Sequence, residues 1–296
     1  MRVELGYACI NTKLGGFKSY TLRHLKENPL EIIARIRYNF RHTVNIIINN
    51  CERNIKLYRL TSELVPLATH VEFKEWEKQV GWSWKEDKDI LQYLEWIKLL
   101  NQDQNLHLTL HPGQYTVLNS PKKEIHEKAV EDLEYHQWVL NKIGGEFLVI
   151  HLGGVYGNKE ASKQRFISKF NTLSKDLQDI LVIENDDKSY GVKDIIEVSK
   201  EIGCLPLIDF HHHRCNPSKF DLNEVVRLWK DKKRNIKVHL SSGKAFEKDR
   251  RHSDFVDVED FQWVISEYNK TNYSDTLWLM LECKEKDKCI DKLKLT

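Results

Sequence analysis

The sequence has little cysteine and no long apolar run. Its six cysteines are scattered along 296 residues without a CxxC pair, which argues against a secreted disulfide scaffold and for a reducing compartment. No apolar stretch approaches the roughly 18 residues that are needed to cross a bilayer. The N-terminal segment MRVELGYACI lacks the apolar core and the cleavage site of a signal peptide. We therefore expect a cytoplasmic protein without a membrane partner.

The chain also lacks an excess of either charge sign. Its 46 Lys and Arg residues face 44 Asp and Glu residues, which leaves a net charge of +2. This balance excludes a protein that is basic all over, so a site for a polyanion has to be a local patch. Two basic runs are candidates, Lys230–Lys237 (KDKKRNIK) and Lys244–Arg251 (KAFEKDRR). Taken alone, each run is most simply a solvated face.

Short apolar, β-branched runs alternate along the chain with longer amphipathic segments. The eight runs are Val3–Ile10, Ile55–Leu60, Leu106–Leu110, Phe147–Ile150, Ile180–Ile183, Leu205–Ile208, Ile236–Val238 and Leu277–Leu281. Eight strand–helix units without a break in composition predict a single (β/α)8 TIM barrel over residues 1–296. A doubly wound parallel sheet is the alternative, because a pattern does not reveal whether a sheet closes.

The segments between the runs carry apolar residues at helical spacing, which predicts helices packed on the barrel. The stripes are Ile33, Ile36, Phe40, Val44 and Ile47; Phe166, Phe170, Leu173 and Leu177; Leu222, Val225 and Trp229; and Phe261, Val264 and Tyr268. Pro29 and Asp257 precede two of these segments and are expected near helix starts.

A histidine or a carboxylate follows the last six predicted strands. These residues are His111, His151, Glu184, Asp209, His239 and Glu282. Asp, Glu and His together occupy about one position in five, so six in succession arise by chance with a probability of order one in ten thousand. Since the carboxyl ends of barrel strands form the active-site face, these groups converge. Converged carboxylates and imidazoles call for cations, which predicts bound metal ions.

Two further histidines can reach the same face. His212 lies three residues after Asp209, and His252 lies in the loop after the seventh strand. Eight candidate ligands exceed the three or four that one ion takes, so we expect two or three divalent ions, with Zn, Mn or Fe suited to mixed imidazole and carboxylate ligands. His211, His213, Cys215 and Cys283 lie near these ligands in sequence but are expected not to bind metal.

Paired divalent ions of this kind stabilise the attacking and leaving oxygens of phosphodiester hydrolysis, and Glu184 on a central strand is placed to ligate two ions. A sugar isomerase on the same fold is the alternative. Imidazoles supply five of the eight candidate ligands, which favours hydrolysis, because isomerase sites rely mainly on carboxylates. A metal-dependent DNA-binding protein without catalysis is an alternative of another class.

Lys237 lies two residues before His239 on the same predicted strand, so both side chains are expected to face the barrel interior. A free ammonium group close to metal ions is unfavourable. We therefore expect Lys237 to be neutral, chemically modified or paired with a carboxylate of the barrel.

Eight segments, taken in chain order, carry a resemblance to a known family. They are LGYACIN (Leu5–Asn11), LATH (Leu67–His70), HPGQY (His111–Tyr115), VIHLGG (Val149–Gly154), IEND (Ile183–Asp186), DFHHHRCNP (Asp209–Pro217), KVHLS (Lys237–Ser241) and LECKEK (Leu281–Lys286). Together they resemble the UV damage endonucleases, which are barrels related to the metal-dependent apurinic endonucleases. The resemblance covers essentially the whole chain, and the combination of HPGQY with DFHHHRCNP is highly specific.

The resemblance implies an enzyme that cuts double-stranded DNA immediately 5′ of cyclobutane pyrimidine dimers and 6-4 photoproducts, and also acts on abasic sites. It implies 3′-hydroxyl and 5′-phosphate products, a monomer, and manganese as the usual metal, with zinc or another divalent ion as the alternative. The implied metal ligands are those reached from the strand ends: His111, His151, Glu184, Asp209, His212, His239, His252 and Glu282.

The resemblance also assigns residues beyond the ligands. It implies a carboxylated Lys237 and catalytic roles for Glu184, Lys237, Glu282 and His70, and the family's DNA and lesion contacts match Tyr7, Asn11, Gln114 and Tyr115. One position departs from the related apurinic endonucleases, which carry an Asp where this chain has Arg250. Asp254 or a modified Lys237 is the expected substitute ligand for the third ion.

Overall fold

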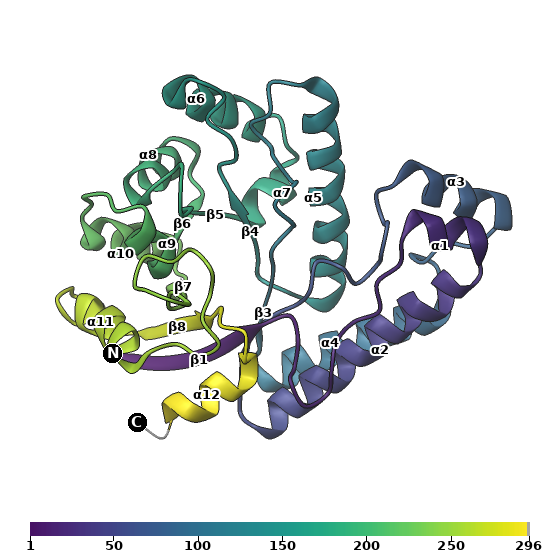
Figure 1. Ribbon diagram of the computed structural model, residues 1–296, viewed down its shortest axis with the longest axis horizontal. Coiled ribbons are helices and arrows are strands. Elements are labelled where there is room, and N and C mark those ends of the chain that lie inside the picture. Colours follow the sequence, from purple (N-terminus) through teal and green to yellow (C-terminus); the bar gives the residue numbers. More distant parts are fainter. Residues whose placement is uncertain (295–296) are drawn as a thin grey trace.

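The computed structural model describes residues 1–294, and eight parallel strands form a closed barrel in it (Figure 1). The strands are β1 (Arg2–Ala8), β2 (Leu57–Arg59), β3 (His107–Leu110), β4 (Phe147–His151), β5 (Leu181–Glu184), β6 (Leu205–Asp209), β7 (Lys237–Leu240) and β8 (Thr276–Leu281). Each strand pairs with the next along the chain, and β8 pairs with β1. The predicted (β/α)8 barrel is therefore confirmed, and the doubly wound sheet is wrong because the sheet has no open edge.

Each predicted run overlaps a strand, and the bounds differ by at most two residues. The differences matter at the carboxyl ends. His151, Glu184 and Asp209 are the last residues of their strands, and His239 lies inside β7. Because ladder hydrogen bonds hold them, these side chains are placed by the sheet rather than by a loop. The register places His151 beside Glu184 and Asp209 beside His239.

Helices surround the barrel, and four of the connections contain two helices. The helices are α1 (Leu22–Glu27), α2 (Glu31–Glu52), α3 (Val71–Val80), α4 (Lys88–Gln104), α5 (Lys123–Ile143), α6 (Lys159–Phe170), α7 (Lys175–Ile180), α8 (Val192–Ile202), α9 (Phe210–Cys215), α10 (Leu222–Asp231), α11 (Val258–Asn269) and α12 (Lys286–Lys294). The long helices α2 and α4 lie side by side along one side of the barrel (Figure 1). Within residues 1–294, no helix has the length and apolarity that crossing a membrane requires.

The predicted apolar stripes are buried, with one correction to the helix that carries them. Phe166 and Phe170 lie on α6, but Leu177 lies on the separate helix α7. The chain turns between them, and Ser174 begins α7 by accepting a hydrogen bond from the Leu177 backbone N–H. Serine competes with the helical backbone in this way, so one apolar stripe spans two helices that both pack on the core.

The two expected helix starts lie close to the observed ones. Pro29 comes two residues before α2. Asp257 occupies the N-cap position of α11, although its side chain makes no capping hydrogen bond.

Candidate metal centre

Glu184 is the centre of a cluster at the carboxyl end of the barrel. Its carboxylate is 1% exposed and lies between three imidazoles. Oε2 is 2.9 Å from His111 Nε2 and 3.4 Å from His151 Nε2, and Oε1 accepts a hydrogen bond of 2.5 Å from His239 Nδ1. One carboxylate thus faces ligand groups on both of its oxygens, which is the arrangement of a bridging ligand.

Ligand atoms of this cluster form two groups in which all atoms lie within 4.8 Å of one another. One group is His111, His151 and Glu184, and the other is Glu184, Asp209, His239 and Glu282. Glu184 belongs to both. Six of the eight candidate ligands therefore converge, each within reach of a small cation.

A divalent cation fits the second group because Asp209 has an unsatisfied oxygen. Asp209 is fully buried, and its Oδ1 accepts a hydrogen bond of 2.7 Å from the His212 backbone N–H. Its Oδ2 has no hydrogen-bond partner among the described residues. A buried carboxylate oxygen without a partner is costly, and a cation between Asp209, Glu184 and Glu282 removes that cost.

The charges in the cluster shift the pKa values of its members. Burial alone would raise the pKa of Glu184, but His239, His151 and His111 hold it well below its usual range. Burial alone would lower the pKa of His239, but Glu184 and Glu282 raise it to about 10. The carboxylates therefore hold a proton on His239, which an entering divalent ion has to displace.

Four of the five candidate histidines are oriented by backbone carbonyl groups. The Nδ1 atoms of His111 and His212 lie 3.0 Å from the carbonyl oxygens of Pro112 and Asn185, respectively. The Nδ1 atoms of His151 and His252 lie 3.4 Å and 2.5 Å from carbonyl oxygens at the ends of β5 and β8. Each ring thereby keeps Nε2 available, which is how proteins usually orient a metal-binding imidazole.

His212 and His252 lie next to the two ligand groups without being part of them. The His212 ring centroid is 5.8 Å from that of His151 and 6.2 Å from that of His252. Asp209, Glu184 and Glu282 outweigh burial and raise the pKa of His212 to about 9. Both rings border the same mouth, at the side where a further ion would be bound.

The flanking histidines and cysteines point elsewhere. His211 is fully buried, with Nε2 at 4.0 Å from Cys215 Sγ. His213 packs edge-on against Phe220, and Cys283 is buried in the core. In the described part of the chain, none of these four side chains belongs to either ligand group.

Two residues of the site escaped the sequence analysis. Arg59 ends β2 and forms an ion pair with Glu282 although its side chain is only 11% exposed. Asn185 joins β5 to β6, since it donates to the Asp209 carbonyl at 3.0 Å and accepts from the Asp209 backbone N–H at 2.9 Å. Arg59 could have been found as the polar residue within an otherwise apolar run, and Asn185 as the residue directly after Glu184.

Lys237 begins β7, two residues before the ligand His239, and belongs to neither ligand group. Its ammonium group is 2.6 Å from Glu146 Oε2 and 5.0 Å from the centre of the Phe147 ring. Burial lowers the pKa of Lys237, and the lysine and His107 together hold that of Glu146 down at about 2. Lys237 faces the interior as expected, and the structure shows it paired with a barrel carboxylate.

Asp254 and Lys237, the expected substitute ligands for a third ion, do not belong to the two ligand groups. Arg250 is exposed, and its Nε lies 3.4 Å from Asp187 Oδ2. Asp254 is also exposed, on the loop that carries His252. The structure therefore has the cation Arg250, and not a carboxylate, two residues before His252.

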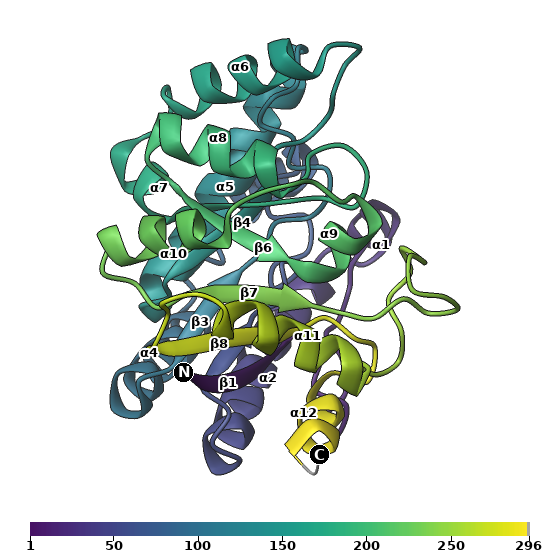
Figure 2. The same cartoon turned by 90° about the vertical axis from the view of Figure 1, so that its left-hand side faces the viewer.

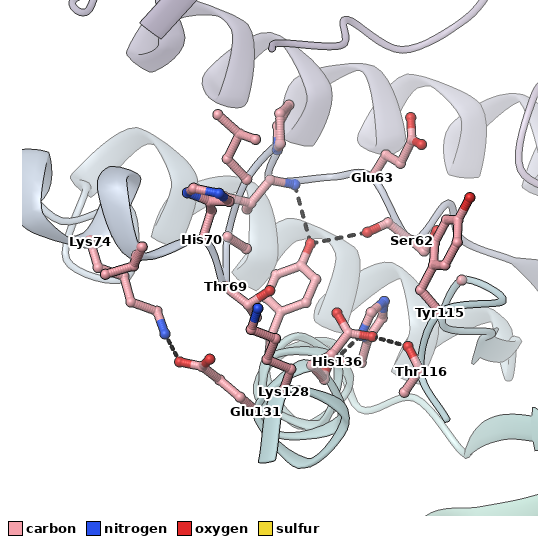
Figure 3. A pocket seen from close by; sticks show the side chains of 18 of the residues that line it. Ser62, Glu63, Thr69, His70, Lys74, Tyr115, Thr116, Lys128, Glu131 and His136 are labelled. Atoms are coloured by element: carbon pink, nitrogen blue, oxygen red, sulfur yellow. Dashed lines mark hydrogen bonds and ion pairs between the residues drawn. The ribbon is translucent and has the colours of Figure 1, made fainter. Parts of the chain in front are cut away.

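His70 and Tyr115 line a cavity of about 960 Å³ between the segment after β2 and the turn after β3 (Figure 3). His70 caps α3, accepting a hydrogen bond of 3.2 Å at Nδ1 from the Glu72 backbone N–H, and it is not in either ligand group. Tyr115 is 84% exposed and lies next to the exposed Gln114 on the turn after β3. The following residue, Thr116, anchors this turn by donating a hydrogen bond to Asp132 of α5.

Tyr7 and Asn11 lie inside the protein rather than on the DNA-facing surface. Both are 0% exposed. The Tyr7 hydroxyl donates to Asn50 at 2.7 Å and accepts from Asn11 at 3.0 Å, and burial raises the Tyr7 pKa to about 12. Their hydrogen bonds hold the loop after β1 in place. Direct contact of these two residues with DNA stays a prediction.

Fold and cluster together define a class: a (β/α)8 barrel protein with a candidate divalent-metal centre at the carboxyl ends of its strands. Its relatives give the family. The model of the UV-endonuclease UvdE family matches residues 3–296, and the chain belongs to this family.

The UV DNA damage endonuclease of Clostridium perfringens is 30% identical over 307 aligned positions, which cover 99% of this chain and 71% of that protein. The crystal structure of SacUVDE has a TM-score of 0.85 and 28% identity, covering 99% of both chains. Endonuclease IV from Thermus thermophilus has a TM-score of 0.60 and 13% identity over 99% of this chain and 98% of that chain, and this likeness shows the fold alone.

Proposed function

We propose that this protein is a DNA-repair endonuclease that cuts double-stranded DNA immediately 5′ of cyclobutane pyrimidine dimers and 6-4 photoproducts, and also acts on abasic sites. The observation that carries the proposal is the pair of ligand groups that share Glu184, together with the unsatisfied oxygen of Asp209 in the second group. Family membership supports the same reaction and speaks against a sugar isomerase. The expected products carry a 3′-hydroxyl and a 5′-phosphate.

The ligand set supports two or three divalent ions, with manganese expected first. His111, His151, Glu184, Asp209, His239 and Glu282 hold the ions of the two convergent groups, and His212 with His252 serves a further ion. Divalent ions here supply Lewis-acid stabilisation of the charge that develops on a phosphodiester during in-line displacement. Arg59 keeps Glu282 oriented through their ion pair.

Lesion recognition is assigned to Gln114 and Tyr115. A photolesion lies inside the duplex, so the damaged bases have to leave the stack and another group has to fill the space. An exposed amide beside an exposed phenol ring suits that task, because a ring stacks on bases and an amide hydrogen-bonds to them. The anchor from Thr116 to Asp132 supports this role by fixing the turn that presents both residues.

Carboxylation of Lys237 is part of the proposal. Burial lowers the pKa of its amine, and the neutral amine is the form that adds CO2 to give a carbamate and a proton. The carbamate would be repelled by Glu146, which now pairs with the ammonium. It would therefore turn along β7 toward His239 and the cations at the mouth.

The test is nicking of UV-irradiated supercoiled plasmid with manganese. We expect conversion to the open circle, no conversion of unirradiated plasmid, and resealing of the nicks by DNA ligase, which requires 3′-hydroxyl and 5′-phosphate ends. An intact plasmid without a mobility shift would indicate the sugar isomerase. A shifted but supercoiled plasmid would indicate a damage-binding protein without nuclease activity.

A further inference from the structure

The loop between β7 and α11, residues 241–257, has a defined structure although it contains no helix or strand. Gly243 and His252 form an antiparallel bridge across it. The buried Asp249 carboxylate accepts a backbone N–H and two side-chain hydrogen bonds from Arg251. A Cβ on Gly243 would collide with the Phe246 carbonyl oxygen, so the close approach needs glycine. We call this segment the basic loop.

The basic loop presents an aromatic ring and several cations to solvent. Phe246 is 65% exposed at the far end of the loop. Lys244, Lys248, Arg250 and Arg251 are exposed as well. A single exposed apolar side chain is ordinary on a protein surface, so Phe246 bears on binding only because it lies among these cations.

The loop carries four cations (Lys244, Lys248, Arg250 and Arg251) and four carboxylates (Glu247, Asp249, Asp254 and Asp257), but arginine side chains engage two of these carboxylates. Glu247 faces Arg214 at 3.5 Å, outside the loop, and Asp249 is taken by Arg251 at 2.7 Å. Lys284, on the segment after β8, is exposed, and its backbone N–H donates to the Ser253 carbonyl oxygen of the loop at 3.0 Å. Lys284 therefore adds a cation to the same surface, and a local group of exposed cations favours a polyanion.

The barrel places this cation cluster across the metal centre from Tyr115. In a closed eight-stranded barrel paired in chain order, β7 lies opposite β3, whose following turn carries Gln114 and Tyr115. His252 fixes the basic loop to the mouth through the Glu282 carbonyl at 2.5 Å. Figure 2 shows the segment after β7 reaching out beyond the carboxyl end of that strand.

We propose that the basic loop is a second DNA-binding element, which grips the phosphate backbone on the undamaged side of the scissile bond while Phe246 packs against the same duplex. The inference rests on the proposed function. If Gln114 and Tyr115 occupy the lesion and the metal centre holds the bond 5′ of it, the duplex that continues away from the lesion passes over the opposite rim. That duplex is undamaged, so the contact is independent of sequence and lesion.

The test is the salt dependence of binding to an undamaged duplex, measured by fluorescence anisotropy. Because each lost phosphate contact lowers the slope of log K against log salt by about 0.9, Lys244→Gln with Lys284→Gln should lower it by about 1.8. Phe246→Ala should weaken binding about fivefold or more, because the ring no longer buries its apolar surface against the duplex. Each variant should weaken binding to dimer-bearing and undamaged duplexes by the same factor.

The matched control is Lys230→Gln with Lys232→Gln, which removes the same charge at the other end of β7. These lysines belong to the first basic run, which precedes β7 and so lies away from the active-site face. An equal change of slope in this control would overturn the proposal, because net charge alone would explain the effect. A loss confined to the dimer-bearing duplex would also overturn it, since the loop would then read the lesion.

The outcome is separable from that of the proposed function. The slope is measured on DNA without damage and without cleavage, whereas the proposed function is tested by nicking of irradiated plasmid. If the protein does not nick irradiated plasmid but the Lys244 and Lys284 variant shows the reduced slope, the DNA-binding role of the basic loop stands and the nuclease proposal fails. If the protein nicks irradiated plasmid but the slope of that variant is unchanged, the nuclease proposal stands and the role of the basic loop fails.

Discussion

Replacing Glu184 by Gln tests the bridging role of this carboxylate with little change in shape. In the structure both Glu184 oxygens face imidazoles, and the side chain belongs to both ligand groups. Gln keeps one oxygen but places an amide where the second oxygen ligates, and it removes the negative charge that two cations would share. We expect cleavage to fall by about three orders of magnitude or more, equivalent to roughly 4 kcal/mol of barrier.

The same change has a calculable cost to folding. Removing one partner of a buried ion pair costs about 3–5 kcal/mol, and Glu282 at 3.0 Å from His239 still offers that ring a partner. The lower end of the range, about 3 kcal/mol, corresponds to a fall in Tm of roughly 5 °C for a single domain of 296 residues. The variant should therefore be folded at 25 °C, and affinity for dimer-bearing DNA should be largely retained.

The assay is single-turnover cleavage of a labelled duplex carrying one dimer, at saturating manganese, with Tm and Kd measured on the same samples. Asp287→Asn is the matched control, because Asp287 is equally buried and pairs with Arg53 at 2.8 Å outside the cluster. It should lose stability but keep cleavage. Near-normal cleavage by Glu184→Gln, or an equal loss in Asp287→Asn, would refute the bridging assignment.

Three further predictions concern recognition, metal uptake and modification. Gln114→Ala with Tyr115→Ala should lower affinity for a dimer-bearing duplex about tenfold or more and leave undamaged DNA unaffected; equal weakening of both at one salt concentration would show that the pair does not read the lesion. The pKa values of His212 and His239, raised to about 9 and about 10, mean that metal binding near pH 7 releases protons, which calorimetry in buffers of different ionisation enthalpy detects. Because these two pKa values are raised in the folded state, protonation of the histidines stabilises the metal-free fold fully below about pH 6.5. The Tm of the metal-free protein should therefore fall as the pH rises toward 10, and a Tm that does not change with pH would contradict the raised pKa values. For Lys237, a high-resolution crystal structure of the manganese form should show density beyond the amine, whereas density that ends there would exclude the carbamate.

Much of the metal cluster is predictable because strand ends carry it. The apolar run that predicts β5 stops at Glu184, and the same rule finds His111, His151, Asp209 and His239. A parallel barrel brings every strand's carboxyl end to one face, so spacing along the chain converts directly into proximity. His212 lies on α9 and His252 on the loop after β7. The pattern predicts both as ligands, and the structure places them near the cluster but outside both ligand groups.

The same pattern does not predict how deeply a side chain is buried or which distant residue it pairs with. Tyr7 belongs to a predicted strand and Asn11 to the loop after it. The sequence pattern does not reveal that both side chains are buried and joined by a hydrogen bond. Lys237 was correctly placed on an inward face, but its partner Glu146 lies on the segment before β4. That pairing follows from the diameter and stagger of the barrel, which no local pattern contains.

The sequence by itself determined the alternation of strands and helices, the chemistry of the strand ends and the family. Apolar periodicity and residue type are local properties, and each acts within a few residues of chain. Only the tertiary structure decided that the sheet closes, that Glu184 faces imidazoles on both oxygens, that Arg59 pairs with Glu282, and that the basic loop stands across the mouth from Tyr115. These are distances between residues far apart in the chain, and packing of the whole barrel sets them.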